Sequence, residues 1–155
     1  MAFSQAEADH LAAIPKSITG TLAWERINGS ECASLRVGNT QGQHIELRLR
    51  VHPKAPEQLH AMLIWRQLNV RRLDVRDDHV NDATGEVWRG KTHKHRWTDR
   101  YGDGEAYTPE DIPEPDDSPV GPTHYRGIVE AFCRECNIDP EGLEWRDPDL
   151  WEEAP

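Results

Sequence analysis

The segment HIELRLRV at residues 44–51 carries the feature that most restricts the fold of this chain. Apolar side chains occupy every second position (Ile45, Leu47, Leu49 and Val51), and polar or charged side chains fill the positions between them. A period of two is typical of a β-strand with one buried and one exposed face, because successive side chains of a strand point to opposite sides. We therefore expect a sheet with one polar face.

Other segments also have the composition of strands. We expect strands in ITGTLAWERI and CASLRV, which flank the turn-forming NGSE, and in QLHAMLIW, VRRLDV and THKHRWT. Residues 77–90 are rich in Asp, Asn and Gly and are expected to form a loop with a brief hairpin.

Both ends of the domain have helical patterns. SQAE at residues 4–7 has the form of a capping box, and THYRGIVEAFCRECNI at 123–138 places apolar side chains near one helical face. We predict an α+β fold: a mainly antiparallel sheet of about 5–6 strands, with an N-terminal and a C-terminal helix packed on one face.

The 155 residues suffice for one domain with a substantial core. We expect that domain over residues 1–140, including an irregular, acidic and proline-rich segment at 103–122. An acidic tail that contains tryptophan follows at 141–155.

The net charge of −10 argues against a broad DNA-binding surface, because each phosphate contact needs Lys or Arg. No stretch approaches the roughly 20 apolar residues that span a bilayer, and the N-terminus does not resemble an export signal. We therefore expect a cytoplasmic protein without membrane contact, whose three cysteines are reduced.

The candidate site lies in GKTHKHRWTDRYGDGEAY, residues 90–107. On a strand, His93 and His95 project to one face, where two imidazoles could act as general base and general acid on a phosphodiester. His79 and Asp103 are candidate further catalytic residues. Cationic and polar neighbours would bind the substrate; these are Arg72, Asn81, Lys94, Arg96 and Tyr107.

Two other interpretations of the same histidines stay open. They could be polar residues of an exposed strand without a function, or they could join Cys133 and Cys136 in a zinc site. Cys133 and Cys136 lie in an apparently helical segment, where small buried side chains are the more ordinary interpretation. We therefore predict no cofactor, with zinc as the alternative.

The stretch from Arg71 to Ile112 resembles the core of an uncharacterised family of small bacterial and prophage proteins, a domain of unknown function. The motifs that carry the resemblance are Arg72 with Asp74, His79 with Asn81, His93-Lys94-His95 with Trp97, and Gly102-Asp103 with Ala106. The resemblance implies a mobile-element setting and a functional histidine cluster, and it supplies no activity. The acidic PEDIPEPDDSP segment and the tryptophan-rich tail depart from the family's pattern.

Two functions follow as hypotheses. The first is an RNase-like protein that processes phosphodiesters or nucleotides at a histidine-centred site. The second is a non-enzymatic acidic protein, an inhibitor or counter-defence factor, that binds a basic protein partner through its negative surface.

Overall fold

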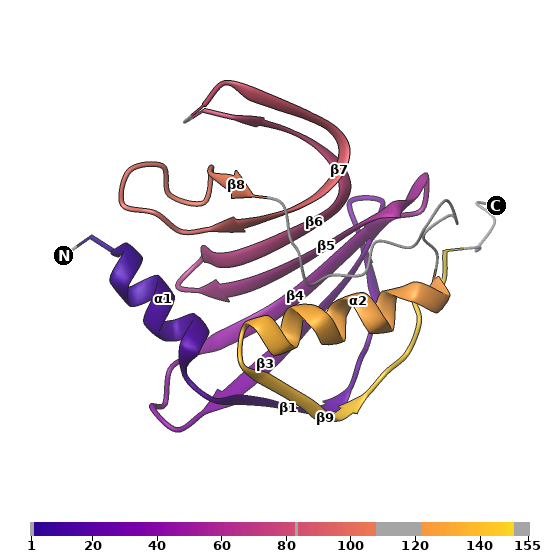
Figure 1. Cartoon of the computed structure of the whole chain (residues 1–155). Helices are drawn as coiled ribbons and strands as arrows, with labels where there is room; N and C mark the ends of the chain where they lie inside the picture. The colour runs from indigo at the N-terminus through magenta and orange to yellow at the C-terminus, as the bar shows by residue number, and fades with distance from the viewer. Residues whose placement is uncertain (1, 83, 108–121, 151–155) are drawn as a thin grey trace.

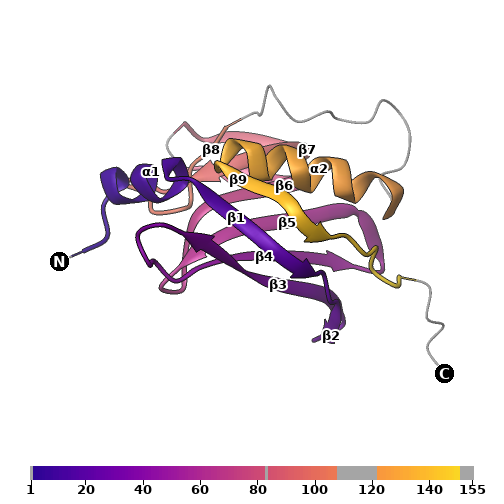
Figure 2. The same ribbon diagram turned by 90° about the horizontal axis from the view of Figure 1, so that it is seen from below.

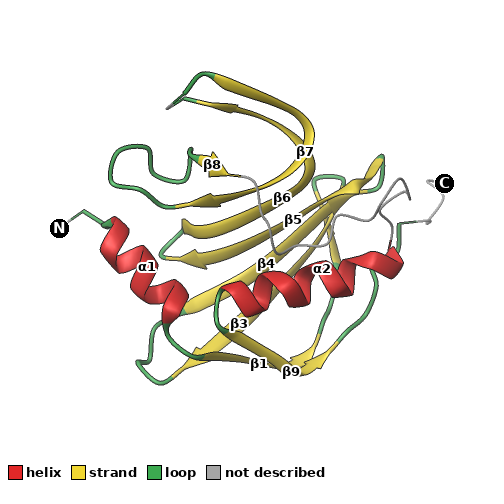
Figure 3. Ribbon diagram, in the orientation of Figure 1, coloured by secondary structure: helices red, strands yellow, loops and turns green. Residues whose placement is uncertain are grey.

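A computed structural model describes residues 2–82, 84–107 and 122–150 of the chain (Figure 1). It has two helices and a large, mainly antiparallel sheet, which confirms the α+β fold (Figure 3). The elements in chain order are α1 (Gln5–Ala13), β1 (Lys16–Thr21), β2 (Glu25–Ile27), β3 (Ser30–Asn39), β4 (Ile45–His52), β5 (Ala55–Trp65), β6 (Leu68–Asn81), β7 (Glu86–Arg96), β8 (Ala106–Tyr107), α2 (Pro122–Glu135) and β9 (Ile138–Glu144).

The sheet has nine strands within the described residues, so the prediction of 5–6 strands was wrong. Its order is β8-β7-β6-β5-β4-β3-β1-β9, and β2 pairs with β3. From β3 to β8 each strand is antiparallel to the next, whereas β1 and β9 pair in parallel. The missed strands are short, or lie in sequences with many polar residues, so their period of two is weak.

The hydrophobic core forms one cluster of buried side chains. It contains residues of both helices, such as Leu11 and Phe132, and alternate residues of the central strands, such as Leu47, Leu63 and Leu73. The alternation predicted for residues 44–51 is present: Ile45, Leu47, Leu49 and Val51 are buried. The polar side chains between them therefore project from the opposite face.

The β6–β7 hairpin replaces the loop expected at residues 77–90. Both strands continue through this region to a turn between Asn81 and Glu86, and the pairing register shifts between Asp74 and Asp77 and again before His79. Such bulges bend a strand. The hairpin curves into a C shape with β8 inside the bend (Figure 1), and the Asn81 amide donates to the Ala106 carbonyl of β8 (3.0 Å).

The described residues after α2 pack on the rest of the domain. The expected boundary at residue 140 falls inside β9, which runs beside β1 (Figure 2). Beyond β9, the Trp24 indole donates to the Arg146 carbonyl (2.7 Å), and Leu150 is buried. Most of the acidic segment expected at 103–122 and residues 151–155 lie outside the described residues. Neither described helix is long and apolar enough to cross a membrane.

The parallel β1–β9 contact gives the first testable prediction. A Cβ on Gly142 would lie 2.7 Å from the Ile18 carbonyl oxygen and 2.9 Å from Thr19 Cγ2. Gly142→Ala must therefore push the two strands apart, and we expect it to lower the unfolding free energy by about 1–3 kcal/mol. Thermal unfolding followed by circular dichroism measures this loss.

Gly127→Ala is the matched control. A Cβ on this exposed glycine of α2 meets nothing within 4 Å, and alanine favours a helix interior. We expect this variant to gain roughly 0.5–1 kcal/mol. Equal stability of the two variants would show that β9 does not pack on β1 as described.

Candidate functional site

A continuous row of side chains crosses five strands on the polar face of the sheet. The Cα register pairs Cys32 with Arg50, Arg50 with His60, His60 with Asp74, and Asp74 with His93. Directly opposed residues on neighbouring strands share a face and lie in contact range. The row therefore brings a cysteine, an arginine, two histidines and a carboxylate together from segments far apart in sequence.

A second row runs parallel to the first. It pairs Ser34 with Arg48, Arg48 with Met62, Met62 with Arg72, and Arg72 with His95. The two rows together make a polar surface on which the imidazoles lie at the β7 end and the arginines of β4 lie near the β3 end.

Asp74 is the centre of the site. Its side chain is only 7% exposed, and its Oδ1 lies 2.7 Å from His60 Nδ1. Its Oδ2 accepts from Arg72 Nε (3.0 Å) and lies 3.2 Å from His95 Nε2 and 3.4 Å from His93 Nε2. One buried carboxylate thus contacts an arginine and three histidines from β5, β6 and β7.

The surroundings of Asp74 hold it in the ionised form. Burial by itself would raise the pKa of this carboxyl, but the polar contacts of His60, His93 and His95 and the charge of Arg72 lower the pKa far below its usual range. The site therefore contains a permanent buried negative charge.

The backbone orients two of the imidazoles. His93 Nδ1 lies 2.6 Å from the Lys91 carbonyl oxygen, and His95 Nδ1 lies 2.7 Å from the Asp103 carbonyl oxygen. Since a carbonyl only accepts, each Nδ1 carries the proton. The neutral form of each ring then has a lone pair on Nε2, and both Nε2 atoms point toward Asp74.

His79 completes the cluster from the far side of the bent hairpin. Its ring centroid lies 5.2 Å from that of His93 and 4.6 Å from that of His95. Burial, with the neighbouring His95 and His93 imidazoles, lowers the pKa of His79 and favours its neutral form. The Nε2 atoms of His79 and His93 are both buried without a hydrogen-bond partner.

The histidines predicted to be catalytic therefore do converge. The fourth predicted catalytic residue, Asp103, supports them: its carbonyl fixes His95, and its Oδ2 accepts from Asn69 (2.8 Å) and Arg72 (3.3 Å). Of the predicted substrate-binding residues, Arg72 lies within the cluster, where its Nη2 is 2.9 Å from His95 Nε2. Asn81 instead ties the hairpin to β8.

Three predicted substrate-binding residues lie apart from the histidines. Lys94 is 2% exposed and forms an ion pair with Glu135 of α2. The Tyr107 hydroxyl also donates to Glu135 (3.1 Å), and burial raises the pKa of this hydroxyl. The Arg96 guanidinium lies 5.5 Å from the centroid of the Tyr107 ring. Because strand side chains alternate, Lys94 and Arg96 project from the face opposite His93 and His95.

The proposed set of two histidines and two cysteines is not assembled. Cys133 and Cys136 are buried thiols in and just after α2, and burial raises the pKa of each. Among the described residues, two groups of three side chains could each hold a metal ion, because their ligand atoms all lie within 4.8 Å of one another. Neither group contains a cysteine. The groups are His79 with His93 and His95, and His60 with Asp74 and Asp77.

Comparisons with known proteins add no assignment. Neither a protein-family model, nor a curated protein, nor a solved structure matches the chain. The chemistry of the site must therefore be inferred from its own geometry.

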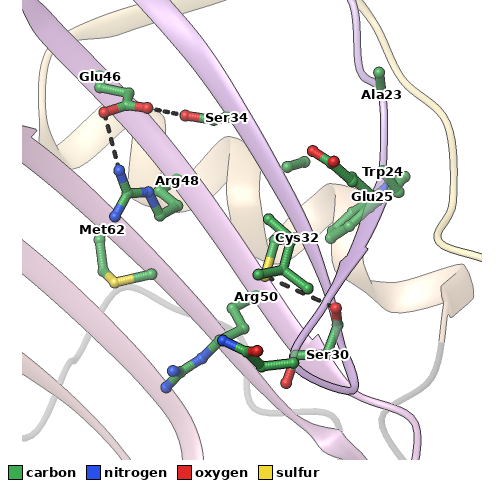
Figure 4. A pocket seen from close by; sticks show the side chains of 13 residues that line it. Ala23, Trp24, Glu25, Ser30, Cys32, Ser34, Glu46, Arg48, Arg50 and Met62 are labelled. Atoms are coloured by element: carbon green, nitrogen blue, oxygen red, sulfur yellow. Dashed lines mark hydrogen bonds and ion pairs between the residues drawn. The ribbon is translucent and has the colours of Figure 1, made fainter.

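A groove of about 750 Å³ opens on the same polar face, toward β3 and β2 (Figure 4). Arg48 is held there by Glu46 (Nη2 to Oε2, 3.2 Å), whereas Arg50 is exposed and has no ion-pair partner among the residues that the structure describes. The residues that give the groove its chemistry are Trp24, Cys32, Ser34, Arg48, Arg50 and Met62.

The site residues predicted from the sequence did not include Asp74 and His60, the central residues of the site. Asp74 stands between the apolar Leu73 and Val75 in a strand, and His60 stands between Leu59 and Ala61. A polar residue inside an apolar run indicates a buried polar contact, because a buried polar side chain needs hydrogen-bond or charge partners. Pairing the two residues required the strand register, which the sequence does not contain.

Replacing Asp74 tests whether its charge holds the cluster together. Asp74→Asn retains the shape but leaves Arg72 facing a neutral group, so we expect a loss of about 3–5 kcal/mol in unfolding free energy at pH 7. The folded carboxyl stays ionised at lower pH than the unfolded one, so its contribution is complete above about pH 4 and falls as the pH drops below that value. Urea unfolding between pH 3 and pH 7 measures both effects.

Asp82→Asn is the control, because Asp82 is exposed in the hairpin turn. It should change stability by less than about 0.5 kcal/mol at every pH. A loss in Asp74→Asn as small as that in the control would show that the carboxylate does not organise the site.

Proposed function

We propose that this protein binds a phosphate-bearing ligand of the nucleotide class on the polar face of the sheet and performs acid–base chemistry on a phosphate ester there. The row that places Arg50 next to His60, and His60 next to the buried Asp74, carries the proposal. In this arrangement a cation for the phosphate and an oriented base are direct neighbours. The mobile-element setting implied by the resemblance remains part of the proposal.

His60 is better suited to proton transfer than His93 or His95. Its Nδ1 donates to Asp74 Oδ1 (2.7 Å), so the neutral ring has its lone pair on Nε2. That atom is 3.7 Å from Asp77 Oδ2, too far for a hydrogen bond, and the His60 side chain is 14% exposed. His93 and His95 have no exposed surface. A carboxylate that orients a histidine is a recurrent base in hydrolytic sites.

The groove offers groups suited to a nucleotide. Arg50 is an exposed cation next to His60, and a guanidinium matches the geometry of phosphate oxygens. Trp24 and Met62 add apolar surface, and aromatic side chains commonly stack on nucleobases. A volume of about 750 Å³ is within the range of small-molecule sites.

The polar face is available because we infer that both helices cover the other one. Residues of α1 and α2 share a cluster with Leu47 and Leu63, whose side chains alternate with those of Arg48 and Met62. The alternative function is an acidic protein that binds a basic partner through its negative surface. Most of the acidic segment at 103–122, where that contact would be tested, lies outside the described residues.

His60→Ala tests the proposed base. We expect the hydrolysis of 2′,3′-cyclic nucleotides or short RNA to fall by about 10²–10⁴-fold, the usual contribution of a general base. Activity should be measured with chromatographic separation of products, and circular dichroism should show an unchanged fold. Arg50→Ala should weaken binding of the same substrates and raise KM.

His52→Ala and Lys54→Ala are matched controls, because both residues are exposed at the turn between β4 and β5. Both should retain full activity. If wild-type protein processes one of these substrates and His60→Ala processes it equally well, the assignment of His60 is wrong. If none of them binds to wild-type protein, the proposed ligand class is wrong.

A further inference from the structure

We propose that His79, His93 and His95 bind a divalent first-row transition-metal ion, with the Asp74 carboxylate next to it. This site shares the Asp74 carboxylate with the proposed chemistry at His60 but does not depend on that chemistry. The predicted zinc site with Cys133 and Cys136 is thereby replaced by a set of ligands from β6 and β7 alone.

The first observation is the orientation of the imidazoles. Metal-bound histidines almost always donate their second ring N–H to a carbonyl or carboxylate, which fixes the ring and leaves the other nitrogen free to bind. His93 and His95 both have this arrangement, with Nδ1 on the Lys91 and Asp103 carbonyl oxygens (2.6 and 2.7 Å).

The second observation is that two buried imidazole nitrogens have no hydrogen-bond partner. The His93 side chain has no exposed surface, and its Nε2 has no hydrogen-bond partner although it lies 3.4 Å from Asp74 Oδ2. The buried His79 Nε2 also has no partner. Both nitrogens are buried polar atoms that the protein leaves unsatisfied, which is unfavourable. A metal ion bound to both rings would satisfy them.

The third observation is distance. One ligand atom from each of the three histidines lies within 4.8 Å of the others. Two ligands that are each about 2.0–2.1 Å from a zinc ion lie roughly 3.4 Å apart in a tetrahedron, so only small side-chain movements are needed. Imidazole nitrogens suit zinc, iron, copper and nickel rather than magnesium or calcium.

Arg72 is the one group that must move. Its Nη2 lies 2.9 Å from His95 Nε2, where the ion would bind. The guanidinium is planar and rigid, so it must shift as a unit, which also changes its contacts with Asp74 (Nε) and Asp103 (Nη1). Of the cations on β7, Lys94 pairs with Glu135 and Arg89 with Asp78. Lys91 lies 5.7 Å from the Trp88 ring centroid, and Arg96 lies 5.5 Å from that of Tyr107.

The group of His60, Asp74 and Asp77 is the weaker candidate. His60 Nδ1 already donates to Asp74, so this pair is satisfied as a hydrogen bond. The Nε2 atoms of His79 and His93, by contrast, have no hydrogen-bond partner.

Titration of tag-free, chelator-treated full-length protein with Co²⁺ tests the proposal. We expect one ion per chain, visible absorption of a low-symmetry Co²⁺ site, and displacement by Zn²⁺. Zn²⁺ at a hundredfold excess over its Kd should raise Tm by roughly 5–10 °C, and Mg²⁺ should have no effect.

Variants assign the ligands. His79→Ala, at a half-buried position, and His93→Gln should each weaken Co²⁺ binding about a hundredfold or more. Arg72→Met should bind Co²⁺ at least as tightly as wild type, because it removes the competing donor. The exposed His44→Ala and the buried Cys136→Ser should bind as wild type does.

Three results would overturn the proposal. They are the absence of stoichiometric Co²⁺ binding by folded wild-type protein, unchanged binding in both His79→Ala and His93→Gln, and loss of binding in Cys136→Ser with a thiolate-to-metal absorption band in wild type. None of these measurements uses catalytic activity, so they are independent of the substrate proposed above.

Discussion

The buried carboxylate of Asp74 is the constraint on which the polar face depends. A charge in this position is stable only with partners, and it takes them from three neighbouring strands: His60, Arg72, His93 and His95. Removing any one of them leaves another polar group without a partner. The buried side chains on the polar face of the sheet therefore form a polar network, whereas those on the opposite face form a hydrophobic core.

The bend of the β6–β7 hairpin gives this network its third imidazole. In a flat hairpin His79 would lie several residues along the strand from His93 and His95. The register shifts around Asp77, with positive φ angles at Arg76 (50°) and Gly90 (58°), turn the two strands back, and His79 then packs against both rings. The irregular backbone is thus what allows one hairpin to assemble three histidines, and bulges are frequent next to functional sites.

Much of the fold could be predicted from the sequence because the signals were local. The alternation at residues 44–51, the capping box at Ser4 and Glu7, and the apolar face of α2 each depend on neighbouring residues, and each is present in the structure. The strand β9 and the long hairpin were missed because their stability comes from pairing rather than from hydrophobic periodicity. For β9, the close approach at Gly142 is visible only once β1 lies beside it.

The candidate site could be predicted in part for the same reason. The spacing of His93 and His95 places them on one face of a strand, and it also places Lys94 and Arg96 on the other, where the structure has them. The partnership of His60 with Asp74 joins residues 14 apart through a cross-strand pair, and no local pattern encodes it. The chemistry of the site thus depends on register, which only the assembled sheet provides.

The protonation of the buried imidazoles tests this view of the site most directly. Long-range ¹H–¹⁵N NMR of the metal-free protein near pH 7.5 assigns the proton of each histidine ring. We predict that His60, His93 and His95 each carry a proton on Nδ1, the atom that faces Asp74 Oδ1, the Lys91 carbonyl oxygen and the Asp103 carbonyl oxygen, respectively. An Nδ1 without a proton at His93 or His95 would contradict this prediction, because a lone pair would then face a backbone carbonyl oxygen and the ring would not be oriented to bind a ligand through Nε2.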